Sequence, residues 1–227
     1  MNILSAGAAK GLLQIVAARE GIDLTSEFGA VGAMRERLAN GAACDVIVLT
    51  EKMIGELAIA GVVDADSVAT LGKVRTGVAV PSGTKATRVD TTASLKQLLA
   101  NASRIYFPDP ERATAGIHFL KVLNALGLAE SHSARFATYP NGAAAMRAMA
   151  DAGVAEAVGV TQCSEILYTD GVRLLGALSG EFELATVYSA AMTVNAVSRD
   201  AAARLLAAVA DARNDSVRVE AGFETIR

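Results

Sequence analysis

The chain has 227 residues, which suits one large domain or two small ones, and its hydrophobic content of 52% is ample for a buried core. Its net charge of −3 argues against nucleic acid as a partner, because phosphate binding needs a basic face. No apolar stretch reaches the roughly 18 residues that a membrane helix needs, so we expect no membrane insertion.

Strand and helix patterns alternate through the first half of the chain. A glycine closes the first two helices, and the run CDVIVLT is near-continuously apolar, as in buried parallel strands. The predicted elements are a strand at 2–6, a helix at 8–21, a strand at 24–28, a helix at 31–41, a strand at 44–50, a helix at 51–61 and a strand at 74–81.

The second half continues the alternation and ends in a long helix and a tail. Its predicted elements are a helix at 91–101, a strand at 103–107, a helix at 115–128, a strand at 133–140, a helix at 141–153, a strand at 154–162, a short helix at 164–171, a strand at 171–178, a long strand segment at 184–197, a helix at 200–211 and a tail at 219–227.

This order predicts an α/β fold of two lobes, each a mostly parallel sheet flanked by helices. The strands VRTGVAVPSG and ATVYSAAMTV are long and bracket the middle of the chain, so we expect them to be paired crossovers between the lobes. We predict one lobe from residues 1–79 with 187–227 and the other from residues 80–186, with a ligand cleft between them.

Four strand-to-helix junctions combine small residues with a helix start. They are SAGAAKG at 5–11, FGAVGAM at 28–34, the Thr-Ala-Gly of FPDPERATAGIH at 114–116, and YPNGA at 139–143. Small residues let an anion approach backbone N–H groups, and the helix dipole adds partial positive charge there. One such junction could be an ordinary tight turn, but four together favour an anion site.

Cysteine and histidine give no metal-site spacing. Cys44 and Cys163 stand alone and are expected to be buried thiols, although a disulfide between them stays open. His118 and His132 are far from both cysteines, so we expect no metal and no cofactor.

The order of motifs resembles a known family over nearly the whole chain. SAGAAKGLLQIV, FGAVGAMRERLANGAACDVIVLT, FPDPERATAGIHFLKVLNALGL, AVGVTQ and ATVYSAAM are together similar to the molybdate-binding periplasmic proteins and their relatives among the solute-binding proteins of ABC transporters. The resemblance implies a periplasmic-binding-protein type 2 fold, a monomer that closes by a hinge on a small anion, and a possible ABC permease as partner.

The resemblance also implies where the anion would be held. The family uses serine hydroxyls, backbone amides and a tyrosine. Its first serine falls on Ala8 or its neighbours, with Ser5 slightly upstream, and its second falls within 30–32, where no hydroxyl exists. Its backbone contacts fall on Ala115 and near Ala143, and its tyrosine falls on Gln162. The backbone donors are thus preserved and most hydroxyls lost, which favours an anion other than molybdate.

Polar residues near the strand ends could replace the lost hydroxyls. Lys10 and Arg75 would suit a carboxylate, since arginine can grip one with two hydrogen bonds, but either could be a solvated surface charge. The full set of candidate ligand-binding residues is Ser5, Gly7, Ala8, Lys10, Ala30, Val31, Gly32, Thr50, Arg75, Thr76, Thr114, Ala115, Gly116, Asn141, Gly142, Ala143, Gln162 and Tyr188.

A relative of the same family offers an alternative function. Aconitate isomerase resembles the molybdate-binding proteins and shifts a double bond in a tricarboxylate, which needs a general acid and base near one carbon. The candidates are Glu51, Glu165, His118 and Tyr188, and the alternative for each is a structural role.

Three function classes therefore remain: a transport receptor for an anion, an isomerase and a cytosolic sensor. The chain enters an apolar strand directly after Met1 and shows no leader pattern. We expect a periplasmic protein if a leader was removed, and a cytoplasmic one otherwise.

Overall fold

The computed structural model describes residues 1–86 and 88–226, and these divide into two compact units. Unit 1 contains residues 1–74 and 186–227, and unit 2 contains residues 75–185. The chain passes from one unit to the other inside β4 (Ala69–Pro81) and returns at the start of β9 (Ala185–Met192).

Unit 1 is built on a sheet in the order β2-β1-β3-β9. The first three strands are parallel, and β9 runs antiparallel to β3. The strands that lie wholly in the unit are β1 (Asn2–Ala6), β2 (Thr25–Gly29) and β3 (Val46–Thr50). Its helices are η1 (Gly7–Ala9), α1 (Lys10–Arg19), α2 (Val31–Ala39), α3 (Glu51–Ile59), η2 (Ala65–Ser67), α8 (Arg199–Ala210), η5 (Ala212–Asn214) and α9 (Asp215–Glu220).

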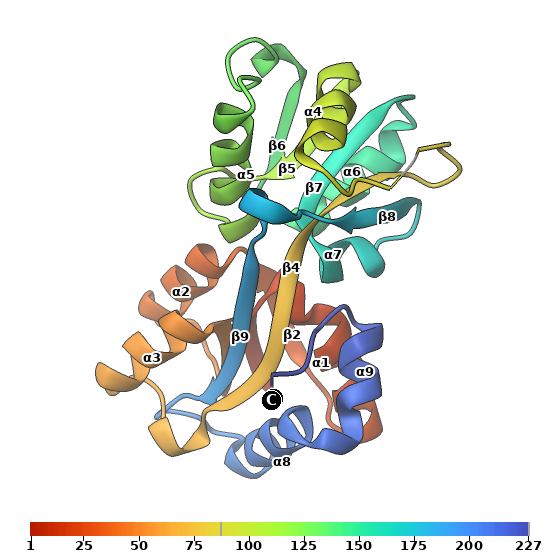
Figure 1. Cartoon of the computed structure of the whole chain (residues 1–227). Helices are drawn as coiled ribbons and strands as arrows, with labels where there is room; N and C mark the ends of the chain where they lie inside the picture. The colour runs from red at the N-terminus through yellow and green to blue at the C-terminus, as the bar shows by residue number, and fades with distance from the viewer. Residues whose placement is uncertain (87, 227) are drawn as a thin grey trace. The chain divides into compact units, whose positions relative to one another are not determined.

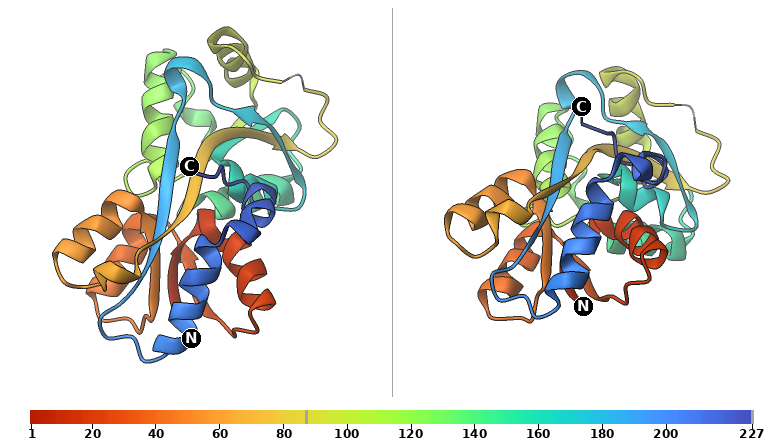
Figure 2. Two further views of the ribbon diagram at one scale, coloured as in Figure 1. Left: turned by 60° about the horizontal axis from the view of Figure 1, so that its bottom comes forward. Right: turned by 90° about the horizontal axis from the view of Figure 1, so that it is seen from below.

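Helices cover both faces of the unit 1 sheet. Helices α2 and α3 lie on one side and contact β3, whereas α1, α8 and α9 lie on the other (Figure 1). Figure 2 shows α1, in red, beside the blue α8 and α9, and α1 packs against both. The apolar stripe of α1, Leu12, Leu13 and Val16, is fully buried. These helix positions leave the carboxyl ends of β1, β2 and β3 leading into three helix starts at one edge of the sheet.

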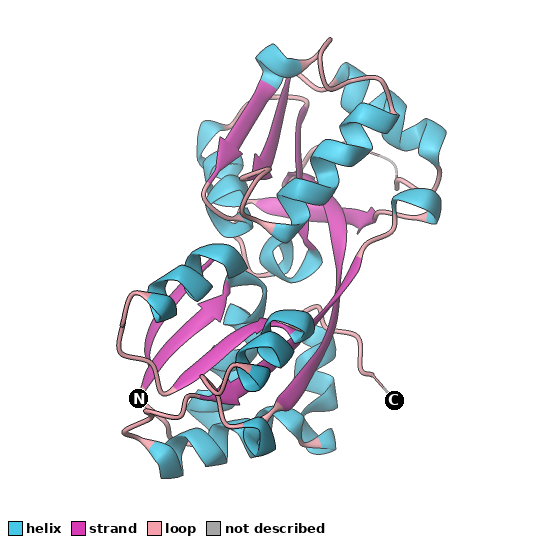
Figure 3. Ribbon diagram, turned by 90° about the vertical axis from the view of Figure 1, so that its left-hand side faces the viewer, coloured by secondary structure: helices cyan, strands magenta, loops and turns pink. Residues whose placement is uncertain are grey.

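Unit 2 is built on a mixed sheet in the order β4-β7-β5-β6, with β8 also paired to β4. Strands β5, β6 and β7 are parallel, and β4 is antiparallel to both β7 and β8. Figure 3 shows helices in cyan on both sides of these strands. The further elements are α4 (Thr92–Asn101), β5 (Arg104–Pro108), α5 (Thr114–Ala125), η3 (Ser133–Arg135), β6 (Phe136–Tyr139), α6 (Gly142–Ala152), β7 (Ala157–Gln162), α7 (Cys163–Leu167), β8 (Val172–Ala177) and η4 (Gly180–Phe182).

The two faces of the unit 2 sheet carry separate cores. On one face, Val78 of β4 and Val160 of β7 pack in a cluster with Phe119 of α5. On the other face, Ala79 and Ala157 pack in a cluster with Met146 of α6. Because strand side chains alternate between faces, this division shows which face each later residue of β4 and β7 occupies.

The structure corrects several sequence-based predictions. The expected mostly parallel sheets are mixed, since β4 and β9 both run antiparallel to their neighbours. Strand β4 begins at Ala69 rather than Val74, because the Lys73 N–H bonds to the Glu224 carbonyl and extends the strand pairing. Strand β9 ends at Met192 rather than continuing to 197.

The chain end and the cysteines also differ from expectation. Helix α9 forms immediately before and within the predicted tail, because Val217 and Arg218 are buried. Within the described residues neither cysteine forms a disulfide; Cys163 is buried as expected, but Cys44 is only partly buried. Within residues 1–86 and 88–226, no helix has the length and apolar character needed to cross a membrane.

Candidate functional site

Helix α2 in unit 1 and helix α5 in unit 2 both begin without a side-chain cap, and the first turn of each is partly buried. Helix α2 follows β2, and its N-cap residue, Ala30, has no side chain that can cap it. Helix α5 follows β5, and its N-cap residue, Ala113, is equally unable to cap. Among the described residues, no hydrogen bond is made by the first-turn amides at 31–33 or 114–116. Buried helix ends of this kind need an acceptor, and an anion supplies one.

The turn before α5 explains the stretch FPDPERATAGIH. The Asp109 carboxylate accepts hydrogen bonds from the N–H groups of Glu111, at 2.7 Å, and Arg112, at 3.1 Å. A Cβ atom at Gly116 would lie 2.2 Å from the Asp109 carbonyl oxygen and 2.3 Å from that of Pro108. Glycine is therefore required here because the first turn of α5 packs directly on the backbone that follows β5.

Helix α6, in contrast, is capped from within unit 2. Its N-cap residue Asn141 accepts a hydrogen bond from the Ala144 N–H at 2.9 Å through its side chain. The Ala143 N–H is bonded to the Glu165 carboxylate. The predicted ligand contacts at Asn141, Gly142 and Ala143 stay a prediction, and a ligand there would have to displace these internal acceptors.

Glu165 is buried beneath the start of α6. Its carboxylate accepts a 2.5 Å hydrogen bond from the Thr161 hydroxyl, and a Cβ at Gly142 would lie 2.0 Å from the carboxylate oxygen Oε2. Burial raises the pKa of Glu165 to about 7, although the hydrogen bonds from Thr161, Ala143 and Gln162 oppose that rise. The group can thus change charge near neutral pH.

Thr76 and Gln162 form a buried polar pair on the opposite face of the unit 2 sheet. They are Cα partners across the antiparallel β4–β7 ladder, and their side chains are 0% and 3% exposed. Neither the Thr76 hydroxyl nor either Gln162 amide atom has a hydrogen-bond partner among residues 1–86 and 88–226. Buried polar atoms are normally paired, so unpaired ones call for a functional explanation.

The strand register places Thr76 and Gln162 at the same edge of the unit 2 sheet as the uncapped first turn of α5. Strands β5 and β7 are parallel, with Tyr106 opposite Gly159, and both end at that edge. The pair shares the face on which Phe119 packs with Val78 and Val160, because Thr76 and Gln162 are each two residues from those valines. The structure therefore brings Thr76, Gln162 and the α5 amides at 114–116 to one corner of unit 2.

The candidate residues of unit 1 also meet at one sheet edge. Ser5 is fully buried, and its hydroxyl donates to the Ala6 carbonyl at 2.9 Å. Gly7 and Ala8 follow in the buried turn η1, beside the start of α2 at Ala30, Val31 and Gly32. Thr50 caps α3 by accepting a 3.4 Å hydrogen bond from the Met53 N–H, and it lies opposite Tyr188 on β9.

The two basic candidates have partners inside their own units. The Lys10 ammonium lies over the Phe28 ring, 5.9 Å from its centroid. The Arg75 guanidinium forms an ion pair with Glu183 at 3.4 Å. A ligand carboxylate would have to compete with these contacts.

The predicted acid–base residues are dispersed. Glu51 is exposed at the first position of α3, where its charge suits the helix dipole. His118 Nε2 lies 2.8 Å from the Phe182 carbonyl oxygen, and the Tyr188 ring packs edge-to-face on Phe223. Glu165 is the candidate with a pKa raised towards neutrality. The two candidates in unit 2 have separate partners, since Glu165 is bonded to Thr161 and His118 to Phe182.

Sequence reasoning missed three further buried hydroxyls. Ser164 in unit 2, and Thr186 and Ser189 in unit 1, have hydroxyl oxygens without a hydrogen-bond partner in the described part of the chain. Ser164 is the second residue of α7, which directly follows the AVGVTQ strand, and Ser189 lies within ATVYSAAM. For Thr186 and Ser189 the available signal was a hydroxyl residue inside an otherwise apolar strand, since such residues are mostly exposed.

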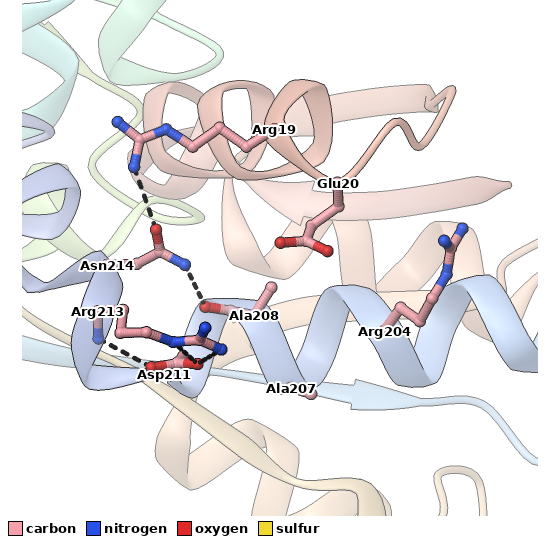
Figure 4. Close-up of a pocket in the computed structure, with 8 residues that line it drawn as sticks. All are labelled: Arg19, Glu20, Arg204, Ala207, Ala208, Asp211, Arg213 and Asn214. Carbon is pink, nitrogen blue, oxygen red and sulfur yellow. Dashed lines mark hydrogen bonds and ion pairs between the residues drawn. The ribbon is translucent and has the colours of Figure 1, made fainter.

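A surface pocket of about 460 Å³ lies on unit 1 and is separate from these corners (Figure 4). Arg213 is held by the Asp211 carboxylate at 2.5 Å, and Arg19 donates to the Asn214 side chain at 3.2 Å. Asn214 in turn donates to the Ala208 carbonyl at 2.9 Å. The contacts of Arg19 and Asn214 join α1 to the end of α8, so Arg19 has a structural role.

Comparisons with known proteins agree with the arrangement of the chain. Residues 2–224 match the family described as bacterial extracellular solute-binding protein. An aconitate isomerase from a Pseudomonas species is 24% identical over 216 residues, which cover 91% of this chain and 80% of the isomerase.

Solved structures show the same fold. The periplasmic molybdate-binding protein of Azotobacter vinelandii superposes with a TM-score of 0.79 and 18% identity, covering 100% of both chains. The sulfate-binding protein SubI of Mycobacterium tuberculosis gives 0.71 and 15% identity, covering 100% of this chain and 86% of that one. The α/β periplasmic-binding-protein fold and the resemblance predicted from the sequence are thus confirmed.

Proposed function

Since the chain belongs to the bacterial extracellular solute-binding protein family, we propose that it captures a small anion, a molybdate-like oxyanion or a carboxylate. The observation that carries this proposal is that α2 in unit 1 and α5 in unit 2 each begin with a partly buried first turn whose amides have no side-chain cap. Each offers a first turn of backbone N–H groups at the positive end of a helix dipole.

Several finer points belong to the same proposal. Units 1 and 2 would be the two lobes, and closure on the ligand would move one against the other by a hinge. The captured anion would be delivered to an ABC permease by a periplasmic, monomeric receptor. The relatives support an anion as cargo, because one is named for molybdate and another for sulfate.

Titration calorimetry of the full chain tests the proposal, with molybdate, sulfate, citrate and cis- and trans-aconitate as probes. The informative variant is Thr114→Pro, because proline is tolerated at the first helical position and removes one amide donor of α5. Ala113 already has the extended backbone that precedes proline, at φ −106° and ψ 129°. We expect at least one probe to bind and this variant to bind it about tenfold more weakly.

Thr92→Pro is the matched control. Thr92 is the first residue of α4, it is exposed, and its preceding residue Thr91 is also extended, at φ −138° and ψ 156°. This variant should bind like the parent chain. Absence of binding by every probe would overturn the proposal. Equal binding by Thr114→Pro and Thr92→Pro would show that the α5 amides do not contribute to anion binding.

A second function is favoured by the sequence similarity to aconitate isomerase. The chain would then shift a double bond in a tricarboxylate by proton transfer, and Glu165, with its pKa of about 7, would be the residue suited to give and take a proton. Its burial at 5% exposure, under α6, supports a structural role instead.

Proton NMR of cis- and trans-aconitate incubated with the chain separates the two functions. Interconversion that disappears in Glu165→Gln would establish the enzyme and give Glu165 a catalytic role. Binding of either aconitate without interconversion would leave the chain a receptor.

A further inference from the structure

We propose that Thr76 and Gln162 select a carboxylate ligand that also carries a hydroxyl group, over a tetrahedral oxyanion. This inference rests on the proposed anion-binding function and names the class of its ligand. The side chains are 0% and 3% exposed, and they are Cα partners on adjacent antiparallel strands. Their proximity is therefore fixed by the β4–β7 ladder.

The chemistry of the pair is mixed in donors and acceptors. Gln162 offers two N–H donors and one oxygen acceptor, and Thr76 offers a hydroxyl that can do either. Neither side chain has a hydrogen-bond partner in the described ranges, so the donors and acceptors of both are available to a ligand. A fully ionised oxyanion has acceptors alone, so it cannot donate to the Gln162 oxygen and would place negative charge close to it.

A hydroxyl group on the ligand can donate a hydrogen bond to the Gln162 oxygen, whereas an ionised oxyanion cannot. It can donate to the Gln162 oxygen and accept from the Gln162 N–H or the Thr76 hydroxyl. The carboxylate of the same ligand would accept hydrogen bonds from the backbone N–H groups at 114–116, which lie at the same edge of the unit 2 sheet. Arg75, next to Thr76 on β4, forms an ion pair with Glu183 at 3.4 Å. The polar side chains proposed to contact the ligand hydroxyl, Thr76 and Gln162, are both uncharged.

Among the described residues, the other buried side-chain atoms without a partner are single hydroxyl groups. The buried Ser164 hydroxyl is also without a partner among the described residues, but a lone hydroxyl can serve as a donor to any anion. Thr161 is already committed to Glu165 at 2.5 Å. Gln162 is thus the residue whose acceptor discriminates between ligand classes.

The test compares ligands that differ by one hydroxyl group. Calorimetry of the full chain would use citrate against tricarballylate and malate against succinate, with molybdate as the tetrahedral probe. We expect the hydroxylated member of at least one pair to bind about tenfold or more tightly than its partner, which is the worth of one hydrogen bond to a buried group. Molybdate should bind more weakly than that hydroxylated ligand.

Two nearly isosteric variants locate the effect. Gln162→Met and Thr76→Val should bring the affinity ratio of the hydroxylated and deoxy ligands close to one. Gln97→Met is the control, since Gln97 is exposed on α4 of the same unit, and it should leave the ratio unchanged. Without ligand, the first two variants should unfold at the same or a higher temperature, because each removes polar atoms buried without a partner.

The outcomes separate the two proposals. If no probe binds, the anion-binding function fails and this inference fails with it. If anions bind but the hydroxyl makes no difference, or Gln162→Met keeps the full ratio, the inference alone is overturned. A lower unfolding temperature of ligand-free Gln162→Met, with the ratio kept, would show that Gln162 has a purely structural role.

Discussion

The Thr161 hydroxyl donates a 2.5 Å hydrogen bond to the Glu165 carboxylate, and Glu165 in turn accepts from the Ala143 N–H at the start of α6. The Glu165 carboxylate therefore lies at the positive end of the α6 helix dipole. The chain therefore stabilises one helix start in unit 2 with its own carboxylate, while it leaves the start of α5 open.

Glu165→Gln should change how stability depends on pH. In the parent chain, burial raises the pKa of this carboxyl from 4.5 to about 7, so folding favours its protonated form. The resulting stabilisation is complete below pH 4.5 and is lost as pH rises to about 7, by up to about 3 kcal/mol. The variant should lack this decline, as urea unfolding between pH 4 and 8 would show.

The control for this experiment is Glu51→Gln. Glu51 also begins a helix after a strand, but it is exposed. Its variant should keep the decline of the parent chain. A decline of equal size in Glu165→Gln would contradict the assignment.

Gly116→Ala should destabilise unit 2. The new methyl group would meet the backbone carbonyls of Pro108 and Asp109 at 2.3 and 2.2 Å, and backbone atoms cannot rotate away as a side-chain end can. We expect a loss of about 1–3 kcal/mol in the free energy of unfolding. Gly55→Ala in the middle of α3 meets nothing within 4 Å, and it should instead stabilise by up to about 1 kcal/mol. Equal effects of the two changes in chemical denaturation would refute this reading of the turn.

Asp45→Asn should weaken unit 1 and alter its response to acid. The Asp45 carboxylate is 2% exposed and accepts hydrogen bonds from the N–H groups of Asn2, Val197 and Ser198 at 2.7 to 2.9 Å. An amide NH₂ facing one of these donors should cost about 1–3 kcal/mol at neutral pH.

The acid response follows from the direction of the pKa shift. Burial opposes ionisation of Asp45, but these backbone hydrogen bonds outweigh it and lower the pKa. The stabilisation is thus present above the unfolded value of about 3.9 and is lost as pH falls below it. Asp45→Asn should lose less stability than the parent chain between pH 5 and 2, whereas Asp66→Asn at an exposed site should match the parent.

The sequence alone predicted most of the elements because apolar periodicity and helix-closing glycines are local signals. It did not predict antiparallel β4 and β9, since strand direction depends on pairing between distant segments such as 76–79 with 159–162. It missed α9 because Val217 and Arg218 become buried only after contacts with the rest of unit 1 form.

In the candidate site, too, the local features were predictable from the sequence and the long-range contacts were not. Small residues before helices indicated the starts of α2 and α5, and the resemblance indicated Gln162. The sequence could not distinguish the open start of α5 from the closed start of α6, because that difference depends on Glu165, more than 20 positions after Asn141. Nor could it pair Thr76 with Gln162, which requires the β4–β7 register.

Thr161→Val should shift the titration of Glu165 upwards. The Thr161 hydroxyl is the foremost of the hydrogen bonds that oppose the effect of burial on this pKa, and valine has the same shape without the donor. Thr169→Val is the matched control, because the Thr169 hydroxyl donates at 2.7 Å to the backbone carbonyl of Glu165 rather than to its carboxylate. Carbon-13 NMR of the Glu165 side-chain carboxyl would follow both variants. We expect the midpoint to lie above that of the parent chain for Thr161→Val and to stay near it for Thr169→Val. A midpoint that falls, or that moves equally in both variants, would show that the hydroxyl does not stabilise the ionised form of Glu165.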